Sequence, residues 1–239
     1  MSYIVTMLTQ GGIVMAADRQ ITQFPTKEKI ESDMPNELFA VQHVCDLLYE
    51  KNKNFYKPLT KSARKLFTIG DNMAFSMGQE LLTKDFYPVE LLADQFCRKN
   101  TFDKPTDAAQ SLFDFMCSKD ENMNLYIHFA GYDKSNTERF TPEFYDIKIS
   151  EKKCEFMGHT GFMYAGANDY FTPYTEKLAN QIMVYTVQDA IDICQLAIDM
   201  SRRLGRYLDF KETISPDEEI VAITPNGIQW VKKSKLEAR

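Results

Sequence analysis

The chain has 239 residues and a mass of 27.7 kDa, a size that fits one large domain. With 44% apolar and 26% charged residues it has the composition of a globular protein. Its net charge of −6 and pI near 5.2 argue against a nucleic-acid binder, which would carry a basic patch or stripe. No apolar run is long enough for a membrane span, and the first residues lack the features of a secretory signal. We therefore expect a cytoplasmic protein with no membrane partner.

Cysteine and histidine spacing gives no sign of a metal or disulfide framework. The five cysteines are odd in number and widely scattered, so we expect them to be reduced, mostly buried, and core residues instead of nucleophiles. They are Cys45, Cys97, Cys117, Cys154 and Cys194. The three histidines lack metal-ligand spacing and are expected to be structural; they are His43, His128 and His159.

The chain opens with a predicted β-hairpin, Tyr3–Leu8 and Ile13–Ala17, joined by a Gln-Gly-Gly turn. These apolar runs show little polar alternation, which indicates strands buried on both faces. The segment from about Gln23 to Pro58 differs, because it holds three prolines and many charges. It also contains an amphipathic stretch at Leu38–Tyr49, so we predict an inserted loop that carries a helix.

The rest of the chain alternates between groups of strands and pairs of helices. Strands are predicted at Lys65–Ile69, Met73–Ser76, Asn124–Gly131, Glu143–Ser150, Lys153–Met157, Phe162–Ala165, Ile220–Thr224 and Ile228–Val231. Helices are predicted at Gln79–Arg98, Pro105–Cys117, Asp169–Gln181 and Val187–Leu204. The last helix places a core face on Ala190, Ile191, Cys194, Ala197, Ile198 and Ser201. This order favours an α+β protein with antiparallel sheets and helices packed outside, and a four-layer αββα sandwich satisfies it, although periodicity alone does not select that arrangement.

Six sequence blocks stand out against this background. They are Gly12–Arg19, Arg64–Ile69, Ala74–Gly78, Phe129–Asp133, Met163–Gly166 and Glu219–Thr224. In this order they resemble the motifs of the proteasome-type N-terminal nucleophile (Ntn) hydrolases, the proteasome β subunits and their bacterial relatives that begin Met-Thr-Tyr. The resemblance spans nearly the whole chain except the segment at about Gln23–Pro58. It implies a single Ntn-hydrolase domain over residues 1–239, a four-layer αββα sandwich of two antiparallel sheets, with an insertion at about 23–58.

The resemblance also implies a catalytic site. Removal of Met1 would expose Ser2, whose free α-amine, with a pKa of about 7.7–8.0, can act as the base for its own hydroxyl. Counted from Ser2, Asp18 is the seventeenth residue, where the family has an acid near the catalytic centre. Lys65 matches the family's catalytic lysine and would favour the anionic hydroxyl, while Asp18 would hold the lysine. The backbone N–H of Gly78 would line the oxyanion hole.

Two of these assignments have rivals. Lys61 lies four residues before Lys65, which we prefer because it directly precedes the Leu-Phe pair. The family's second conserved acid has no clean counterpart, because the region Gly205–Asp217 is longer than usual. Asp209 is the nearest candidate, and Glu212 is its rival.

The predicted reaction is hydrolysis of a peptide or amide bond through an acyl ester on Ser2, with no metal or organic cofactor. The family also implies a homo-oligomer, ring-shaped or helical and ring-like, and leaves open an unfoldase partner. Two departures keep alternatives open: serine stands where most active relatives carry threonine, and Ala167 replaces a supporting serine. A catalytically inactive assembly or structural subunit and a non-proteolytic Ntn amidase acting on a small molecule are the alternatives.

Overall fold

The first two strands carry buried side chains on both faces. The computed structural model describes residues 3–23, 57–60, 63–79, 81–84, 87–135, 141–166, 171–208 and 214–233. Within them, β1 (Tyr3–Leu8) and β2 (Ile13–Asp18) are buried at every position, as the two apolar runs predicted. In β1, Tyr3, Val5 and Met7 belong to one apolar cluster, whereas Ile4 and Leu8 belong to another on the opposite face. The sheet that contains these strands is therefore covered on both sides.

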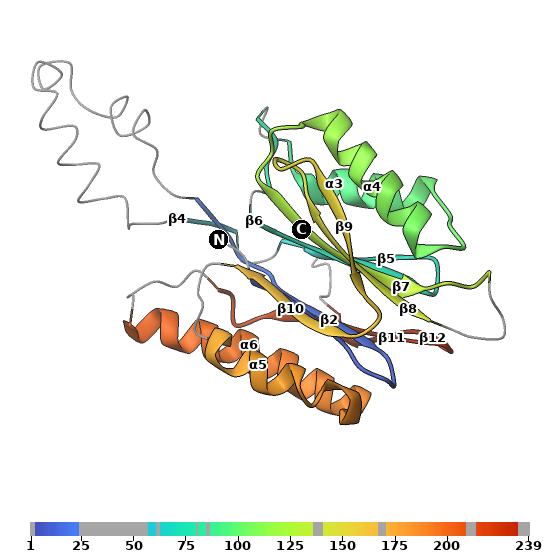
Figure 1. The fold of residues 1–239 in the computed structure, drawn as a ribbon. Helices are drawn as coiled ribbons and strands as arrows, with labels where there is room; N and C mark the ends of the chain where they lie inside the picture. Colours follow the sequence, from blue (N-terminus) through green and yellow to red (C-terminus); the bar gives the residue numbers. More distant parts are fainter. Residues whose placement is uncertain are drawn as a thin grey trace, which may run out of the picture.

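Two five-stranded antiparallel sheets form the centre of the fold (Figure 1). The first has the order β10-β1-β2-β11-β12, and the second has the order β5-β6-β7-β8-β9. The strands not yet bounded are β5 (Leu66–Ile69), β6 (Met73–Gln79), β7 (Leu125–Tyr132), β8 (Pro142–Lys148), β9 (Lys153–Gly158), β10 (Gly161–Gly166), β11 (Glu218–Thr224) and β12 (Gly227–Lys232). A separate two-stranded sheet pairs β3 (Ile21–Gln23) with β4 (Lys57–Thr60).

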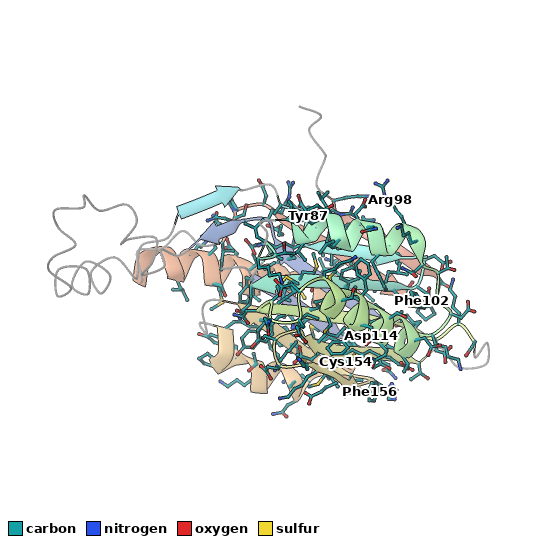
Figure 2. All side chains as sticks on the ribbon, turned by 90° about the horizontal axis from the view of Figure 1, so that it is seen from above. Tyr87, Arg98, Phe102, Asp114, Cys154 and Phe156 are labelled. Atoms are coloured by element: carbon teal, nitrogen blue, oxygen red, sulfur yellow. The ribbon has the colours of Figure 1, made fainter. Side chains whose placement is uncertain are left out.

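Helices cover the outer face of each five-stranded sheet. On the second sheet, α3 (Val89–Lys99) and α4 (Pro105–Lys119) pack over an apolar cluster that includes Phe75, Phe96 and Phe129. Figure 2 looks onto this side, with Tyr87 and Arg98 near the two ends of α3. On the first sheet, α5 (Thr172–Ala179), the short 3-10 helix η3 (Ile182–Val184) and α6 (Val187–Leu208) take the same role (Figure 1). The face predicted for the last helix is confirmed, since all six of its residues are buried.

A third apolar cluster lies between the two sheets. It combines side chains from both, including Ile4, Met15, Leu66, Ala130 and Val221. The inner faces of the sheets thus pack on each other, and the molecule is an α+β protein built on two antiparallel sheets.

The strand predictions agree with the structure to within a few residues, but one helix prediction is wrong at its start. A helix was expected from Gln79, whereas α3 begins at Val89. Between them Thr83 N–H donates to Tyr87 C=O at 3.0 Å, and Leu82 forms a bridge with Pro88. The residue before a proline is disfavoured in the helical region, so Pro88 ends this turn and opens the helix.

The segment at about 23–58 is described only at its ends. Its ends pair as β3 and β4, two strands that the sequence did not predict. The predicted helix at 38–49 lies outside the described residues.

The four described cysteines are free thiols. Cys194 is buried as predicted, whereas Cys97, Cys117 and Cys154 are half-buried, because each lies at the margin of the core under α3 and α4. Burial raises the pKa of Cys97 to about 12 and that of Cys154 to about 11, which disfavours the nucleophilic thiolate. In the described ranges no helix combines the length and apolar character needed to cross a membrane.

Candidate functional site

The end of β2 and the start of β5 bring two opposite charges together in the interior. Lys65 Nζ lies 2.7 Å from Asp18 Oδ1, and both side chains have an exposed fraction of 0%. Asp18 is the last residue of β2, and Lys65 directly precedes β5 in the other sheet. The sequence predicted both residues as catalytic partners, and the structure brings them into direct contact.

The Asp18 carboxylate is also held by three backbone N–H groups. Oδ1 accepts from Tyr3 N–H at 2.7 Å, and Oδ2 accepts from Gln20 N–H at 2.9 Å and from Ser215 N–H at 3.3 Å. These donors come from β1, from the chain just after β2, and from the segment before β11. Because hydrogen bonds to an ionised acceptor are the stronger ones, Asp18 fixes three chain segments around one charge.

Lys65 is positioned through both its ammonium and its backbone. Nζ also donates to Gln20 C=O at 2.5 Å, and Lys65 C=O accepts from Met77 N–H at 2.8 Å. Burial lowers the pKa of the Lys65 ammonium, since the charged form loses its water, and the neighbouring Asp18 carboxylate acts in the opposite direction.

Glu219 is a second buried acid that sequence reasoning did not assign to the site. Its Oε2 accepts from Lys65 N–H at 3.4 Å, its exposed fraction is 1%, and its charge also favours the protonated form of Lys65. Glu219 lies in β11 directly opposite Ala17 of β2, one residue from Asp18. The sequence did contain a signal for this residue, since Glu218 and Glu219 stand together at the start of an otherwise apolar strand. Because side chains alternate between the two faces of a strand, one of the two glutamates must point toward the interior.

Gly78 lies near the same end of the sandwich, at the penultimate position of β6. It is buried, pairs with Tyr126 of β7, and faces Ile4 of the other sheet, so that a Cβ at this position would lie 3.5 Å from Ile4 Cδ1. That distance is an ordinary van der Waals contact, and neighbouring atoms therefore do not force glycine here. At the same end, Tyr3 pairs with Gly166, the last residue of β10.

Several predicted site residues lie outside the described residues. These are Ser2, Lys61, Ala167, Asp209 and Glu212. Their catalytic roles stay predictions, as does the role of Gly78. Ser2 is nevertheless covalently joined to Tyr3, whose N–H is bound by the same carboxylate oxygen as Lys65 Nζ.

Two of the three histidines lie among the described residues, and the ring of each contacts a polar atom of another strand or its neighbouring chain. His128 is fully buried between the sheets, where Nδ1 lies 3.2 Å from Thr6 Oγ1, and burial lowers its pKa to about 3. His159 Nδ1 lies 2.7 Å from Pro142 C=O. Among the described side chains, no group of three or more His, Cys, Asp or Glu is arranged to hold a metal ion.

This arrangement holds the Lys65 ammonium next to the start of β1 and out of contact with solvent. A buried ammonium held by one carboxylate, with a second carboxylate beside its backbone, lowers the free energy of an anion formed in contact with it. A hydroxyl placed against Lys65 Nζ would thus be favoured in its anionic form. This is the requirement of a nucleophilic hydroxyl in amide hydrolysis.

The arrangement of two antiparallel sheets, each covered by helices on its outer face, is also found in a solved structure. The solved structure of a Gly-1 mutant of Anbu, a bacterial proteasome-like Ntn hydrolase, from Hyphomicrobium sp. strain MC1 has this fold, with a TM-score of 0.64. The match covers 100% of this chain and 88% of the Anbu chain at 15% sequence identity, and therefore establishes a shared fold. No protein-family model and no curated protein sequence matches the chain.

Proposed function

We propose that this chain is a proteasome-type Ntn hydrolase that cleaves peptide or amide bonds. In this proposal residues 1–239 form one four-layer αββα domain with an insertion at about 23–58. Ser2 is the nucleophile after removal of Met1, the enzyme is cytoplasmic, and no metal or organic cofactor takes part.

The buried Asp18–Lys65 pair is the observation that carries the proposal. Moving two charges out of water costs several kcal/mol per ion, and their mutual attraction often fails to recover that cost. A protein selected only for stability gains little from such a pair, whereas a nucleophilic site needs its cation fixed and dry. The pair therefore favours a catalytic role over an inactive assembly subunit.

The second support is the position of the pair relative to the chain start. Tyr3 N–H and Lys65 Nζ both donate to Asp18 Oδ1, at 2.7 Å each. An ammonium has three N–H donors, and the contacts to Asp18 and Gln20 account for two of them. We assign the third donor to the hydroxyl of Ser2, the residue bonded to Tyr3.

The proposed roles follow from these contacts. The α-amine of Ser2 takes the hydroxyl proton, Lys65 stabilises the oxyanion character of Oγ, and Asp18 holds Lys65. The end of β6, at Gly78, supplies the backbone donor for the tetrahedral intermediate, and Asp209 provides the second acid near the amine.

The likeness to Anbu also supports assembly of this chain with itself. We propose a homo-oligomer, either a ring or a helical, ring-like stack, with peptides or amides as substrates and no nucleic-acid or membrane partner. Light scattering on the eluted peak of a size-exclusion column measures the mass of this assembly, and a monomer would contradict this part of the proposal.

Activity is tested on purified protein whose N-terminus has been determined by intact mass and Edman sequencing. With Met1 removed, we expect hydrolysis of short fluorogenic peptide amides, and Ser2→Ala should abolish it. Lys65→Met should abolish it as well, whereas Lys61→Met should not. Retention of Met1 in the native source, or hydrolysis that survives Ser2→Ala, contradicts the proposal.

A further inference from the structure

Four neighbouring strands of the second sheet carry a row of polar side chains. Ser76 of β6 pairs with His128 of β7, which pairs in turn with Asp146 of β8. Asp146 then pairs with Glu155 of β9, the edge strand of the sheet. Directly opposite residues of antiparallel strands place their side chains on the same face, about 4.5–5.5 Å apart. The row is therefore continuous from a fully buried serine to an exposed glutamate.

This row lies on the face that packs against the first sheet. The residues two positions away on β6, β7 and β8 all belong to the apolar cluster between the sheets, namely Ala74, Ala130 and Phe144. Because side chains alternate between the two faces of a strand, the polar row shares their orientation. It is thus a polar strip within an otherwise apolar interior.

Three buried atoms of the row have no protein hydrogen-bond partner within the described part of the chain. They are Ser76 Oγ, His128 Nε2 and Asp146 Oδ1. Ser76 and His128 have an exposed fraction of 0%, and Asp146 has one of 6%. Buried polar atoms without a hydrogen bond are costly and rare in native proteins. Three of them on directly paired residues point to a shared partner.

The other contacts of these side chains decide which atoms donate and which accept. His128 Nδ1 lies 3.2 Å from Thr6 Oγ1. Burial lowers the pKa of His128 to about 3, so the ring is neutral, and a Thr6 hydroxyl that donates to Nδ1 leaves the ring proton on Nε2. Asp146 Oδ2 lies 3.4 Å from Lys148 Nζ, so Oδ1 remains as an acceptor. With the Ser76 hydroxyl as a second donor, the row presents two donors and one acceptor.

We propose that Ser76, His128 and Asp146 form a buried binding site for water between the two sheets. Water accepts hydrogen bonds from His128 Nε2–H and the Ser76 hydroxyl and donates one to Asp146 Oδ1. Buried waters typically make about three hydrogen bonds to polar groups of this kind. An anion would face the Asp146 carboxylate, and an apolar ligand would leave all three atoms unbonded. A metal ion does not fit either, since no group of three or more His, Cys, Asp or Glu occurs among the described side chains.

The water site connects strands of both sheets. Its three residues lie on β6, β7 and β8, and the His128 ring reaches Thr6 on β1 of the other sheet. Glu155, exposed at the β9 edge and opposite Asp146, provides a polar route by which water exchanges with solvent. The site does not depend on hydrolase activity, so its test is independent of the proposed function.

Deuteron relaxation dispersion of the full-length protein, cross-linked into a gel, counts internal waters and measures how long each stays bound. His128→Phe keeps a ring in the same space and removes Nε2–H, so we expect it to lose the contribution of at least one internal water. Ser76→Ala keeps the other two partners, and the residence time of this water should fall by about fivefold, the factor that corresponds to one hydrogen bond. Ser118→Ala is the matched control, because Ser118 Oγ donates to Phe115 C=O at 2.7 Å on the surface. It should change neither quantity.

A crystal structure of the parent protein provides a second readout that needs no substitution. We expect electron density for a water within about 3.2 Å of both His128 Nε2 and Asp146 Oδ1. Density that instead places Nε2 in direct contact with Oδ1, with no water beside Ser76, overturns the inference. An unchanged dispersion amplitude in folded His128→Phe overturns it as well. If His128→Phe does not fold, the parent crystal structure and the residence time in Ser76→Ala decide.

Discussion

Lys65 Nζ and Asp18 Oδ1 lie 2.7 Å apart in the interior, although 47 residues separate them along the chain. Asp18 ends β2 of one five-stranded sheet and Lys65 directly precedes β5 of the other, so their contact joins the two sheets at the end where β1 begins. The same contact places a cation beside Tyr3, whose N–H shares the Asp18 oxygen. The pair therefore contributes both to the packing of the two sheets and to the proposed chemistry.

Removing one partner of the pair should destabilise the fold strongly. Lys65→Met leaves the Asp18 carboxylate buried without its cation, and we expect a loss of about 3 kcal/mol in the free energy of unfolding. The double variant Asp18→Asn/Lys65→Met should lose at least about 1 kcal/mol less than the sum of the single variants, because the two residues interact directly. Urea denaturation of the four proteins measures this coupling.

The surface pair of Lys134 and Asp71 provides the control for this cycle. Its lysine is 38% exposed and its aspartate 71% exposed, so water screens their interaction. Lys134→Met should leave the urea midpoint unchanged. If the losses in unfolding free energy of Asp18→Asn and Lys65→Met simply add in the double variant, the two buried residues do not stabilise each other, which would contradict this prediction.

Glu219 should act through the charge that it places beside Lys65. Glu219→Gln keeps the size and hydrogen-bonding capacity of the side chain but removes a buried negative charge, which lowers the pKa of nearby cationic groups. We expect the acidic limb of the kcat/KM profile to move to lower pH, with kcat/KM reduced by about tenfold at neutral pH. A pH profile of peptide-amide hydrolysis checks both effects.

Glu218 is the matched control, since it lies on the same strand and bonds Lys232 Nζ at 2.8 Å on the surface. Glu218→Gln should leave the pH profile unchanged. An equal effect of both substitutions would assign the change to the strand and not to the charge beside Lys65.

Sequence reasoning identified Asp18 and Lys65 because each stands in a motif with a recognisable order of residues. It could not identify Glu219, because the role of this glutamate depends on the pairing of β11 with β2, a contact between distant parts of the chain. The start of α3 was missed for a related reason: the segment before Pro88 has helical composition, but hydrogen bonds between Leu81 and Val89 close a turn there. The strands β1 and β2 were predicted well since their apolar runs are buried at every position and are separated by a clear turn.

His128 should make the protein sensitive to acid. Its pKa is about 3 in the fold because burial excludes the charged form, compared with 6.5 in the unfolded chain. Between these values the unfolded state binds more protons, so stability is complete above pH 6.5 and falls as pH decreases toward 3. The slope contributed by this one group approaches about 1.4 kcal/mol per pH unit within that window.

The contribution is measured as the difference between the parent and His128→Gln, which retains a hydrogen-bonding partner for Thr6. Unfolding free energies of the two proteins should converge as the pH decreases from 7 to 4. His159→Gln, at an exposed position, serves as the control. A parent-to-variant difference that does not depend on pH would contradict a buried, neutral His128.

Gly131 should be required by packing. A Cβ at this position would lie 2.6 Å from Met73 Cγ and 2.9 Å from Asn72 C=O, closer than real side chains approach. Gly131→Ala forces the paired strands β6 and β7 apart, and we expect a loss of about 1–3 kcal/mol by thermal or urea unfolding. Gly161→Ala is the control because nothing lies within 4 Å of its Cβ position. If Gly131→Ala and Gly161→Ala were equally stable, β6 and β7 would not be as close at Gly131 as the structure has them.

Ser2 labelling tests the central claim most directly. A peptide epoxyketone that bonds to both a hydroxyl and a neighbouring free amine reports the two groups that the mechanism requires at one residue. Incubation of Met1-free protein, followed by peptide mapping, should give a single adduct on Ser2 that depends on Lys65. An unlabelled Ser2 in folded, Met1-free protein, or an adduct on another residue, would contradict the account.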